Sequence, residues 1–166
     1  MYFLGIDLGT SSVKIIIMDE SGKVVKTTTR DFEISYPHIG WAEQNPDDWW
    51  EGTKEGIKEI IKLSGLKADE IKGIGFSGQM HGLVLLDKDN KVLMPAILWC
   101  DQRTQEECDY LNNVIGQDKL SKYTANMALT GFTAPKVLWV KKHKPDIYNK
   151  IAKMMLPKDY IRFKLT

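Results

Sequence analysis

The segment Asp7–Thr10, with the adjoining Ser11, has the residue types of a phosphate-binding loop. Asp7 ends the first strand-like run and would bring a carboxylate to Mg²⁺ and to a phosphoryl group in transfer. Gly9 permits a close approach of the backbone to phosphate, and Thr10 and Ser11 offer hydroxyl donors. The alternative is an ordinary hairpin turn in which Gly9 serves the backbone geometry and Asp7 caps the bend. The segment alone supports both interpretations equally.

A second candidate is the segment Gln79–Gly82, which joins two strand-like runs. Loops at the end of a sheet are where open α/β folds commonly bind ligands. The imidazole of His81, flanked by small and flexible residues, could reach a substrate hydroxyl there. On the residues alone, a single histidine in a connecting loop is more often without such a role.

The segment Trp99–Arg103 is a third candidate. Trp99 could stack on a sugar, and Asp101 and Arg103 could hydrogen-bond its hydroxyls. The alternative is that Trp99 packs in the core and that Asp101 caps a helix that follows it. Taken alone, the segment favours the alternative.

Two further motifs argue against other functions. Gly73–Gly78 matches the G-x-G-x-x-G pattern of dinucleotide-binding folds, but its glycines lie inside a strand-like run and the apolar run Leu83–Leu86 follows. A nicotinamide site needs a helix N-terminus after the glycines, so this function is excluded. Cys100 and Cys108 are too few for a disulfide framework and lack partners at zinc-ligand spacing, so we expect reduced, structural thiols.

Charge and hydropathy narrow the classes of partner. The 166 residues carry 23 Lys and Arg against 22 Asp and Glu, without a long run of one sign, which disfavours nucleic acid and anionic membranes as partners. Apolar runs fall far short of the roughly 18 residues of a membrane span. The N-terminus lacks a secretory signal pattern, so we expect a cytoplasmic protein. The length predicts one compact unit.

Three antiparallel strands are predicted to open the chain, over Phe3–Asp7, Val13–Asp19 and Val24–Ile34. A helix is predicted to begin at Asn45 and to end near Gly65, because Pro46 and two acids follow a capping residue. The remaining expected elements are a buried strand over Ile71–Ser77, a strand over Leu83–Leu86 with a hairpin into Val92–Met94, helices over Gln102–Val114, around Asp118–Tyr123 and over Pro135–Lys142, and a short strand at Met154–Leu156 before a last helical turn. This order predicts an α/β domain of the ribonuclease-H-like or actin-like ATPase class, with a mixed sheet covered by helices.

Six segments occur in the order found in the xylulokinases, which are members of the FGGY carbohydrate kinase family. They are Ile6–Ser12, Trp41–Pro46 with Trp49–Trp50, Gly78–Gly82, Pro95–Trp99, Gly131–Lys136 and Leu156–Tyr160. The chain resembles this family along its whole length. The Gln-Met-His-Gly segment is the most xylulokinase-like piece, whereas the Asp-x-Gly-Thr loop is shared by the superfamily.

The resemblance implies transfer of the γ-phosphoryl group of ATP, with Mg²⁺, to D-xylulose, giving D-xylulose 5-phosphate in D-xylose catabolism. It implies that Met80 and His81 contact the ketopentose and that Asp7 serves phosphoryl transfer at the metal. Trp99, Asp101 and Arg103 are further sugar-site candidates.

The resemblance also implies that residues 1–166 are part of an N-terminal actin-like domain, because the pattern of Tyr160–Thr166 stops without a cap. The general base and the adenosine-binding segment of the family are then expected beyond Thr166, in a C-terminal domain that would be this chain's partner. We expect the fragment itself to be inactive, and the family resemblance allows a homodimer.

Other functions fit parts of the pattern. Another kinase of the family, acting on glycerol, gluconate or ribulose, differs only in the few sugar-site residues. An actin-like structural protein shares the Asp-x-Gly-Thr loop but polymerises, and a sugar-responsive binding module would lack catalysis.

Overall fold

The computed structural model describes residues 1–166, and the chain divides into two compact units. Unit 1 comprises Met1–Ile34, Pro46–Gln79 and Pro157–Thr166, and unit 2 comprises Ser35–Asn45 and Met80–Leu156. The expectation of a single compact unit is therefore wrong. The chain folds around more than one group of buried apolar side chains, and each unit has its own.

Unit 1 is built on a four-stranded mixed sheet in the order β3-β2-β1-β5. The strands β1 (Tyr2–Leu8), β2 (Ser12–Asp19) and β3 (Val24–Asp31) are antiparallel neighbours, which confirms the predicted opening of the chain. The strand β5 (Ile71–Gly78) pairs in parallel with β1.

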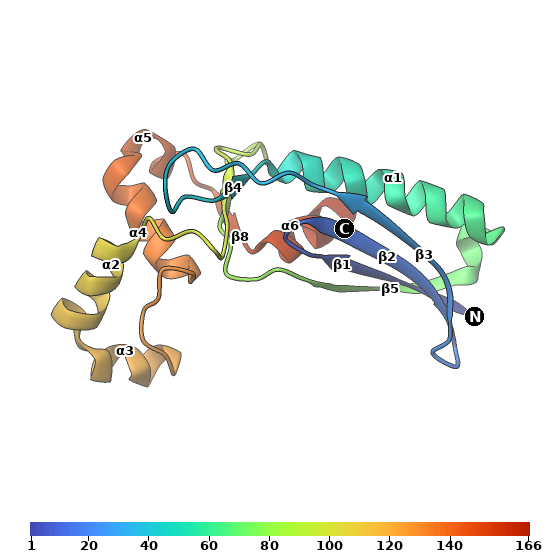
Figure 1. The fold of residues 1–166 in the computed structure, drawn as a ribbon, viewed down its shortest axis with the longest axis horizontal. Helices are drawn as coiled ribbons and strands as arrows, with labels where there is room; N and C mark the ends of the chain where they lie inside the picture. Colours follow the sequence, from blue (N-terminus) through green and yellow to red (C-terminus); the bar gives the residue numbers. More distant parts are fainter. The chain divides into compact units, whose positions relative to one another are not determined.

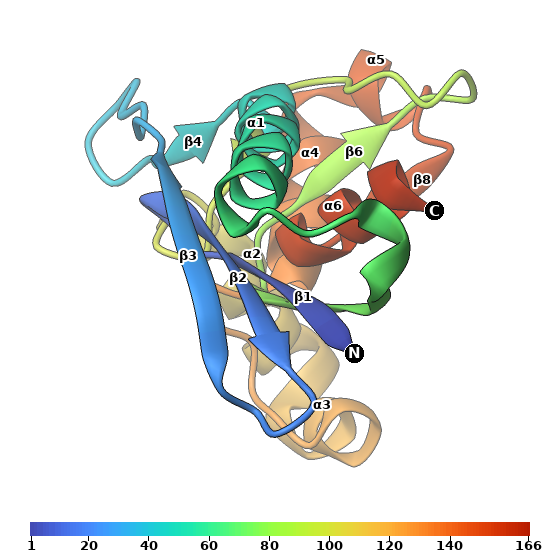
Figure 2. The same cartoon turned by 90° about the vertical axis from the view of Figure 1, so that its right-hand side faces the viewer.

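Two helices cover one face of this sheet (Figures 1 and 2). The helix α1 (Pro46–Ser64) packs on β2 and β3, and α6 (Pro157–Leu165) packs on β1, β5 and α1. The start of α1 has the predicted proline and acids, and its Trp49 and Ile60 are fully buried. The approach to the sheet is close, since a Cβ on Gly56 would lie 2.6 Å from Cδ1 of Ile15.

The strand β5 corrects one prediction. A strand exists over the predicted residues, and its glycines lie inside it, but none of its side chains is fully buried and Ile74 is 47% exposed. The reason is its place at the edge of the sheet, where α6 covers one face only. A 3₁₀ turn, Ala68–Glu70, connects α1 to this strand.

Unit 2 combines short strands with helices. The strand β4 (Glu43–Gln44) pairs with β7 (Ala96–Ile97), and β6 (Val84–Leu86) pairs with β8 (Lys153–Met155). The helices are α2 (Gln105–Asp109), a π-helix over Tyr110–Gly116, α3 (Gln117–Thr124), α4 (Thr133–His143) and α5 (Pro145–Tyr148). Its core contains Leu83, Leu85, Ile97, Trp139 and Val140.

The helical part of unit 2 differs from the prediction at one end. The predicted helix over Gln102–Val114 begins only at Gln105 and continues into the π-helix, which ends at Gly116, where φ is +95° and α3 begins in a new helix. Thr104, not Asp101, occupies the N-cap position. The predicted hairpin after β6 is present as a bridge between Leu86 and Val92.

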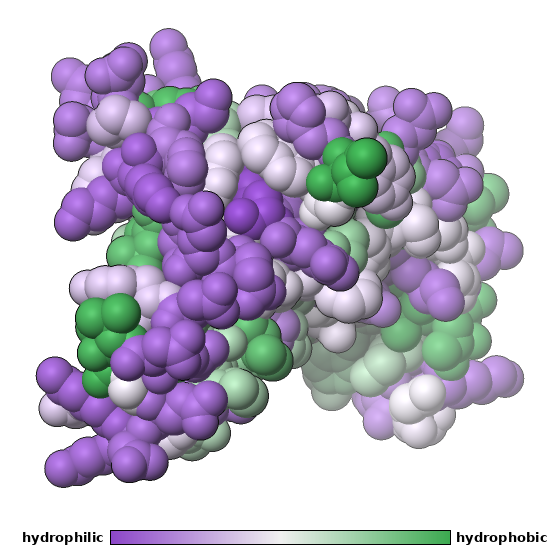
Figure 3. Space-filling model, turned by 60° about the vertical axis from the view of Figure 1, so that its left-hand side comes forward, coloured by the Kyte–Doolittle hydropathy of each residue, from purple (hydrophilic) through white to green (hydrophobic).

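The surface exposes several large apolar side chains, and both cysteines are free. Apolar side chains such as Val114, 72% exposed, reach the surface, and Figure 3 shows hydrophobic patches between hydrophilic ones on one face. Cys100 and Cys108 are free thiols, as predicted, and burial raises the pKa of both. None of the helices combines the length and the apolar character that crossing a membrane requires.

Candidate functional site

The predicted phosphate loop is the tight connection between β1 and β2 in unit 1. Asp7 pairs with Lys14 in the antiparallel register, and the Gly9 N–H donates to the Ser12 carbonyl over 2.9 Å. A Cβ at Gly9 would lie 3.1 Å from that carbonyl oxygen, so the turn favours glycine. The structure thus brings Asp7, Gly9, Thr10 and Ser11 together in one hairpin, with the Asp7 side chain exposed.

The end of β5 anchors this loop. The backbone N–H of Gln79 donates to the Leu8 carbonyl over 2.6 Å, and its side-chain Nε2 donates to the Gly9 carbonyl over 3.3 Å. Gly78 has φ +149°, and a Cβ there would lie 2.5 Å from the Leu8 carbonyl oxygen. The two hydrogen bonds of Gln79 therefore hold the backbone of the loop that follows Asp7, and Gly78 allows β5 to approach it closely.

The donor set near Asp7 fits one kind of metal ion. No group of three or more His, Cys, Asp or Glu side chains in the structure could enclose a metal. Mg²⁺ bound with nucleotide needs no such cage, because it takes one or two carboxylates and fills its shell with phosphate oxygens and water. A single exposed carboxylate beside a glycine turn is compatible with that role, and Asp7 as a ligand of Mg²⁺ stays a prediction.

The second candidate loop, in unit 2, holds His81 in an uncommon conformation. His81 has φ +69°, which residues other than glycine seldom adopt. Its ring stacks on that of Phe132 with centroids 4.7 Å apart and an interplanar angle of 29°. Its carbonyl accepts hydrogen bonds from Lys136 Nζ over 2.9 Å and from Thr133 Oγ1 over 3.1 Å. The preceding Met80 is 50% exposed.

A pocket of about 300 Å³ opens beside this histidine within unit 2. Its wall is mostly apolar and includes His81, Leu111, Met127, Phe132 and Pro135. His81 is the one titratable residue of that wall, and Thr124 and Asn126 are its other polar residues.

Trp99 lies two residues after β7, and His81 lies two residues before Leu83, which is bridged to β7. Leu83 and Ile97 are bridged in an antiparallel register, with hydrogen bonds of 2.9 and 3.3 Å. Trp99 follows Ile97 at the end of that pairing, and the loop Met80–Gly82 leads into Leu83 on the other side. Trp99 is 50% exposed, which leaves part of its indole accessible to a ligand.

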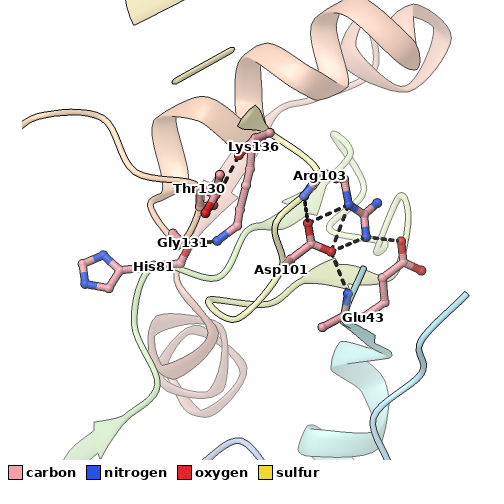
Figure 4. A network of polar contacts seen from close by, with 9 residues as sticks. Glu43, His81, Asp101, Arg103, Thr130, Gly131 and Lys136 are labelled. Carbon is pink, nitrogen blue, oxygen red and sulfur yellow. Dashed lines mark hydrogen bonds and ion pairs between the residues drawn. The ribbon is translucent and has the colours of Figure 1, made fainter. Parts of the chain in front are cut away.

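Asp101 and Arg103 lie in a buried network instead of on the surface (Figure 4). Asp101 accepts from the Ala42 N–H over 2.7 Å, from the Arg103 N–H over 2.9 Å and from Arg103 Nη2 over 2.7 Å. Arg103 Nη2 also pairs with Glu43 over 2.8 Å. The side chains of Asp101 and Arg103 are 0% and 1% exposed, so the structure gives them the role of joining β4 to the segment after β7. Their contact with a sugar stays a prediction.

Two tryptophans complete the surroundings of Arg103. Its guanidinium carbon lies 3.7 Å from the ring centroid of Trp41 and 5.0 Å from that of Trp139. The planar cation thus exchanges water for carboxylates and aromatic faces, which is how a buried guanidinium is stabilised.

Lys136 is the other buried cation of unit 2. It is fully buried in α4, and its Nζ donates to the carbonyls of Gly131, over 2.5 Å, and His81. Burial lowers the pKa of Lys136 to about 8, while the negative charge of Asp101 partly opposes this shift.

Three site residues carry roles that sequence reasoning did not assign: Gln79, Glu43 and Lys136. Lys136 had a usable signal, because it is a single charge within the apolar run from Pro135 to Val140. The roles of Gln79 and Glu43 had none, since they depend on partners that are far away in the sequence.

The family model "FGGY family of carbohydrate kinases, N-terminal domain" matches residues 2–166. The chain belongs to the FGGY family of carbohydrate kinases. This membership confirms the predicted fold class, and the mixed sheet of unit 1 agrees with it.

Individual FGGY kinases are similar over nearly the whole chain. The xylulose kinase of Bacillus subtilis is 48% identical over 165 residues, which are 99% of this chain and 33% of that protein. A crystal structure of a "xyloylose kinase" from Brucella ovis superposes with a TM-score of 0.93 at 40% identity, over 98% of this chain and 34% of that one. The chain therefore spans about a third of the length of its FGGY relatives.

A glycerol kinase shares the same arrangement. The structure of Plasmodium falciparum glycerol kinase with ADP has a TM-score of 0.92 at 27% identity, and the match covers 99% of this chain and 34% of that one. The fold of this FGGY domain is thus common to kinases named for different substrates.

Proposed function

We propose that residues 1–166 are the N-terminal part of an ATP-dependent xylulose kinase. The reaction transfers the γ-phosphoryl group of ATP to a hydroxyl of D-xylulose, giving D-xylulose 5-phosphate and ADP. The observation that carries the proposal is the high identity to a protein named xylulose kinase along 99% of this chain. A C-terminal domain of the same protein, which those longer relatives favour, would supply the base and the adenosine site, and the use of ATP favours the cytoplasm.

The loop between β1 and β2 is proposed as the phosphate end of the site. Phosphoryl transfer asks little covalent chemistry of a protein, so the loop acts by placing charge and donors. Asp7 would hold Mg²⁺, which when bound neutralises charge on the phosphate oxygens. Thr10 and Ser11 would donate hydroxyl hydrogen bonds to those oxygens, while Gln79 keeps the loop backbone in place.

The loop at His81 is proposed as the sugar end of the site. Met80 and Trp99 are each 50% exposed, which suits packing of their apolar side chains against the carbon face of a ketopentose. The His81 imidazole would hydrogen-bond one hydroxyl, and its stacking on Phe132 orients the ring for that bond. Asp101 and Arg103 support this end by holding the segment after Trp99.

The test uses the full-length protein with Asp7→Asn and a control carboxylate variant, Glu55→Gln, on the exposed face of α1 in the same unit. Loss of preorganised charge at a phosphoryl group is worth about 3 kcal/mol, so Asp7→Asn should lower kcat about a hundredfold with little change in the KM for xylulose. Glu55→Gln should leave both unchanged. Turnover of Asp7→Asn within threefold of the parent would contradict the role of Asp7.

The sugar is tested with His81→Ala and a panel of xylulose, glycerol and gluconate. A lost hydrogen bond in a partly dehydrated pocket costs about 1 to 3 kcal/mol in kcat/KM, and only for a substrate that makes the bond. Xylulose should be the best substrate of the parent and should lose most in the variant. A higher kcat/KM for glycerol in the parent would assign the domain to a glycerol kinase instead.

A further inference from the structure

The backbone of His81 needs support from outside its own loop. A left-handed conformation at a residue with a Cβ persists only where the surroundings hold it. The loop residues Met80–Gly82 form no helix or strand of their own. The hydrogen bonds to the His81 carbonyl therefore help to hold the backbone from which its imidazole projects toward Phe132.

Lys136 provides the shorter of these two hydrogen bonds, 2.9 Å against 3.1 Å from the Thr133 hydroxyl. Figure 4 shows the His81 carbonyl turned toward the ammonium group while the imidazole points away from it. Hydrogen bonds from a charged donor are stronger than those from a neutral hydroxyl. Both donors project from the first turns of α4, so one rigid helix holds the carbonyl.

The same ammonium group also holds a second loop. Its Nζ donates to the Gly131 carbonyl over 2.5 Å, and a Cβ on Gly131 would lie only 2.8 Å from the Trp99 carbonyl oxygen. Gly131 is thus packed against the backbone of Trp99. One buried charge consequently connects the loop of His81 with the segment that carries Trp99.

A lysine buried only for packing would be a poor choice at this position. Its ammonium group loses its hydration, and an apolar side chain would fill the same space without that loss. The positive charge is instead compensated by the negative charge of Asp101, and two carbonyl groups accept hydrogen bonds from the ammonium group. The arrangement makes use of a compact donor with a long apolar stem, which arginine does not offer.

We propose that Lys136 is the positioning residue of the sugar-contacting loop: its ammonium group fixes the His81 carbonyl, and thereby the imidazole against Phe132. The kinetic consequence of this role rests on the proposed contact of His81 with the sugar. The role itself concerns the position of the ring and can be measured apart from catalysis.

The experiment compares the full-length parent with Lys136→Met, which keeps an apolar stem and removes the donor. Carbethoxylation of His81 at pH 7 is followed by mass spectrometry of its peptide, with His38 and His143 as internal references. Without its anchor the ring should leave Phe132 and react at least threefold faster. The KM for xylulose should rise at least tenfold, and the KM for ATP should stay within twofold.

Two further variants separate positioning from a general loss of structure. Thr133→Val removes only the hydroxyl donor and should change the same two quantities in the same direction by less. Val140→Ala opens a cavity on the same helix, where Val140 is fully buried, but it removes no donor to His81. It should lower the melting temperature and leave the His81 reaction rate and the xylulose KM unchanged.

The outcomes discriminate between the two proposals. An unchanged His81 rate in Lys136→Met overturns the positioning role, and so does an equal rate increase in Val140→Ala. A faster His81 reaction in Lys136→Met with an unchanged xylulose KM supports the positioning role and overturns the sugar contact of His81. A faster reaction together with the raised KM supports both.

Discussion

Asp101→Asn tests the role that the structure gives to the buried network of unit 2. The substitution keeps the shape of the side chain but removes its charge, and it replaces one acceptor oxygen by an NH₂ group. Asp101 accepts from two backbone N–H groups and from the Arg103 guanidinium, so the new NH₂ group must face a donor. Arg103, 1% exposed, is left with Glu43 as its carboxylate partner.

The size of the effect follows from this geometry. Removing one partner of a buried ion pair costs about 3 to 5 kcal/mol, because it leaves a buried charge uncompensated. Glu43 keeps part of that compensation at 2.8 Å, so we expect the lower end, about 3 kcal/mol of the free energy of unfolding. For a chain of this length the melting temperature should fall by roughly 6 to 12 °C.

The assay is urea unfolding of the purified protein, followed by tryptophan fluorescence, to which Trp41 and Trp139 beside Arg103 contribute. The control is Glu106→Gln, which breaks an exposed ion pair with Lys142 and should leave the urea midpoint unchanged. A loss below about 1 kcal/mol for Asp101→Asn would refute the structural role. An unchanged midpoint with a raised KM for xylulose would instead make Asp101 a direct sugar ligand.

Gly78→Ala should destabilise unit 1 by about 3 kcal/mol or more, measured by thermal unfolding, because its φ of +149° and the Leu8 backbone leave no room for a Cβ. A Tm within 2 °C of the parent, on the order of 1 kcal/mol, would contradict this. Tyr160→Phe removes a 2.8 Å hydrogen bond to Asp47 and should cost about 1 to 2 kcal/mol in urea unfolding, while an unchanged midpoint would show that the bond contributes nothing. For Lys136, the folded pKa of about 8 lies below the unfolded value of 10.5, so its contribution to stability is largest above pH 10.5 and is lost as the pH falls through 8. The free energy of unfolding of the parent minus that of Lys136→Met should therefore rise by about 3 kcal/mol between pH 8 and 10.5, and a flat difference would mean that the lysine titrates normally.

Local patterns predicted unit 1 well. The alternating β-branched residues of β2 and the Pro46 start of α1 act within a few residues, so their signals are present in the sequence itself. The burial predicted for β5 was wrong for a non-local reason, because the place of this strand at the sheet edge depends on the order of the strands. The hairpin at Asp7 was predictable for the same local reason, whereas its role toward phosphate stays a prediction.

Unit 2 was predicted less completely because its short elements depend on distant partners. The strands β4 and β7 contain two residues each, too few to show a period of two. Asp101 has the local pattern of a helix cap, but the Ala42 N–H, 59 positions away, and Arg103 compete successfully for its carboxylate. The partners of Lys136 are backbone carbonyls, which no residue type can indicate.

The division of unit 1 into three stretches of sequence bears on the order in which the protein can fold during synthesis. The polypeptide passes from one unit to the other after residues 34, 45, 79 and 156, so neither unit is a single continuous segment. The sheet and α1 leave the ribosome first, yet α6, whose Tyr160 and Ile161 are buried, follows only after all of unit 2. A nascent chain shorter than about 157 residues therefore leaves uncovered the part of β1 and β5 on which α6 packs. The packing of α6 on the sheet is thus a later event than the synthesis of unit 2.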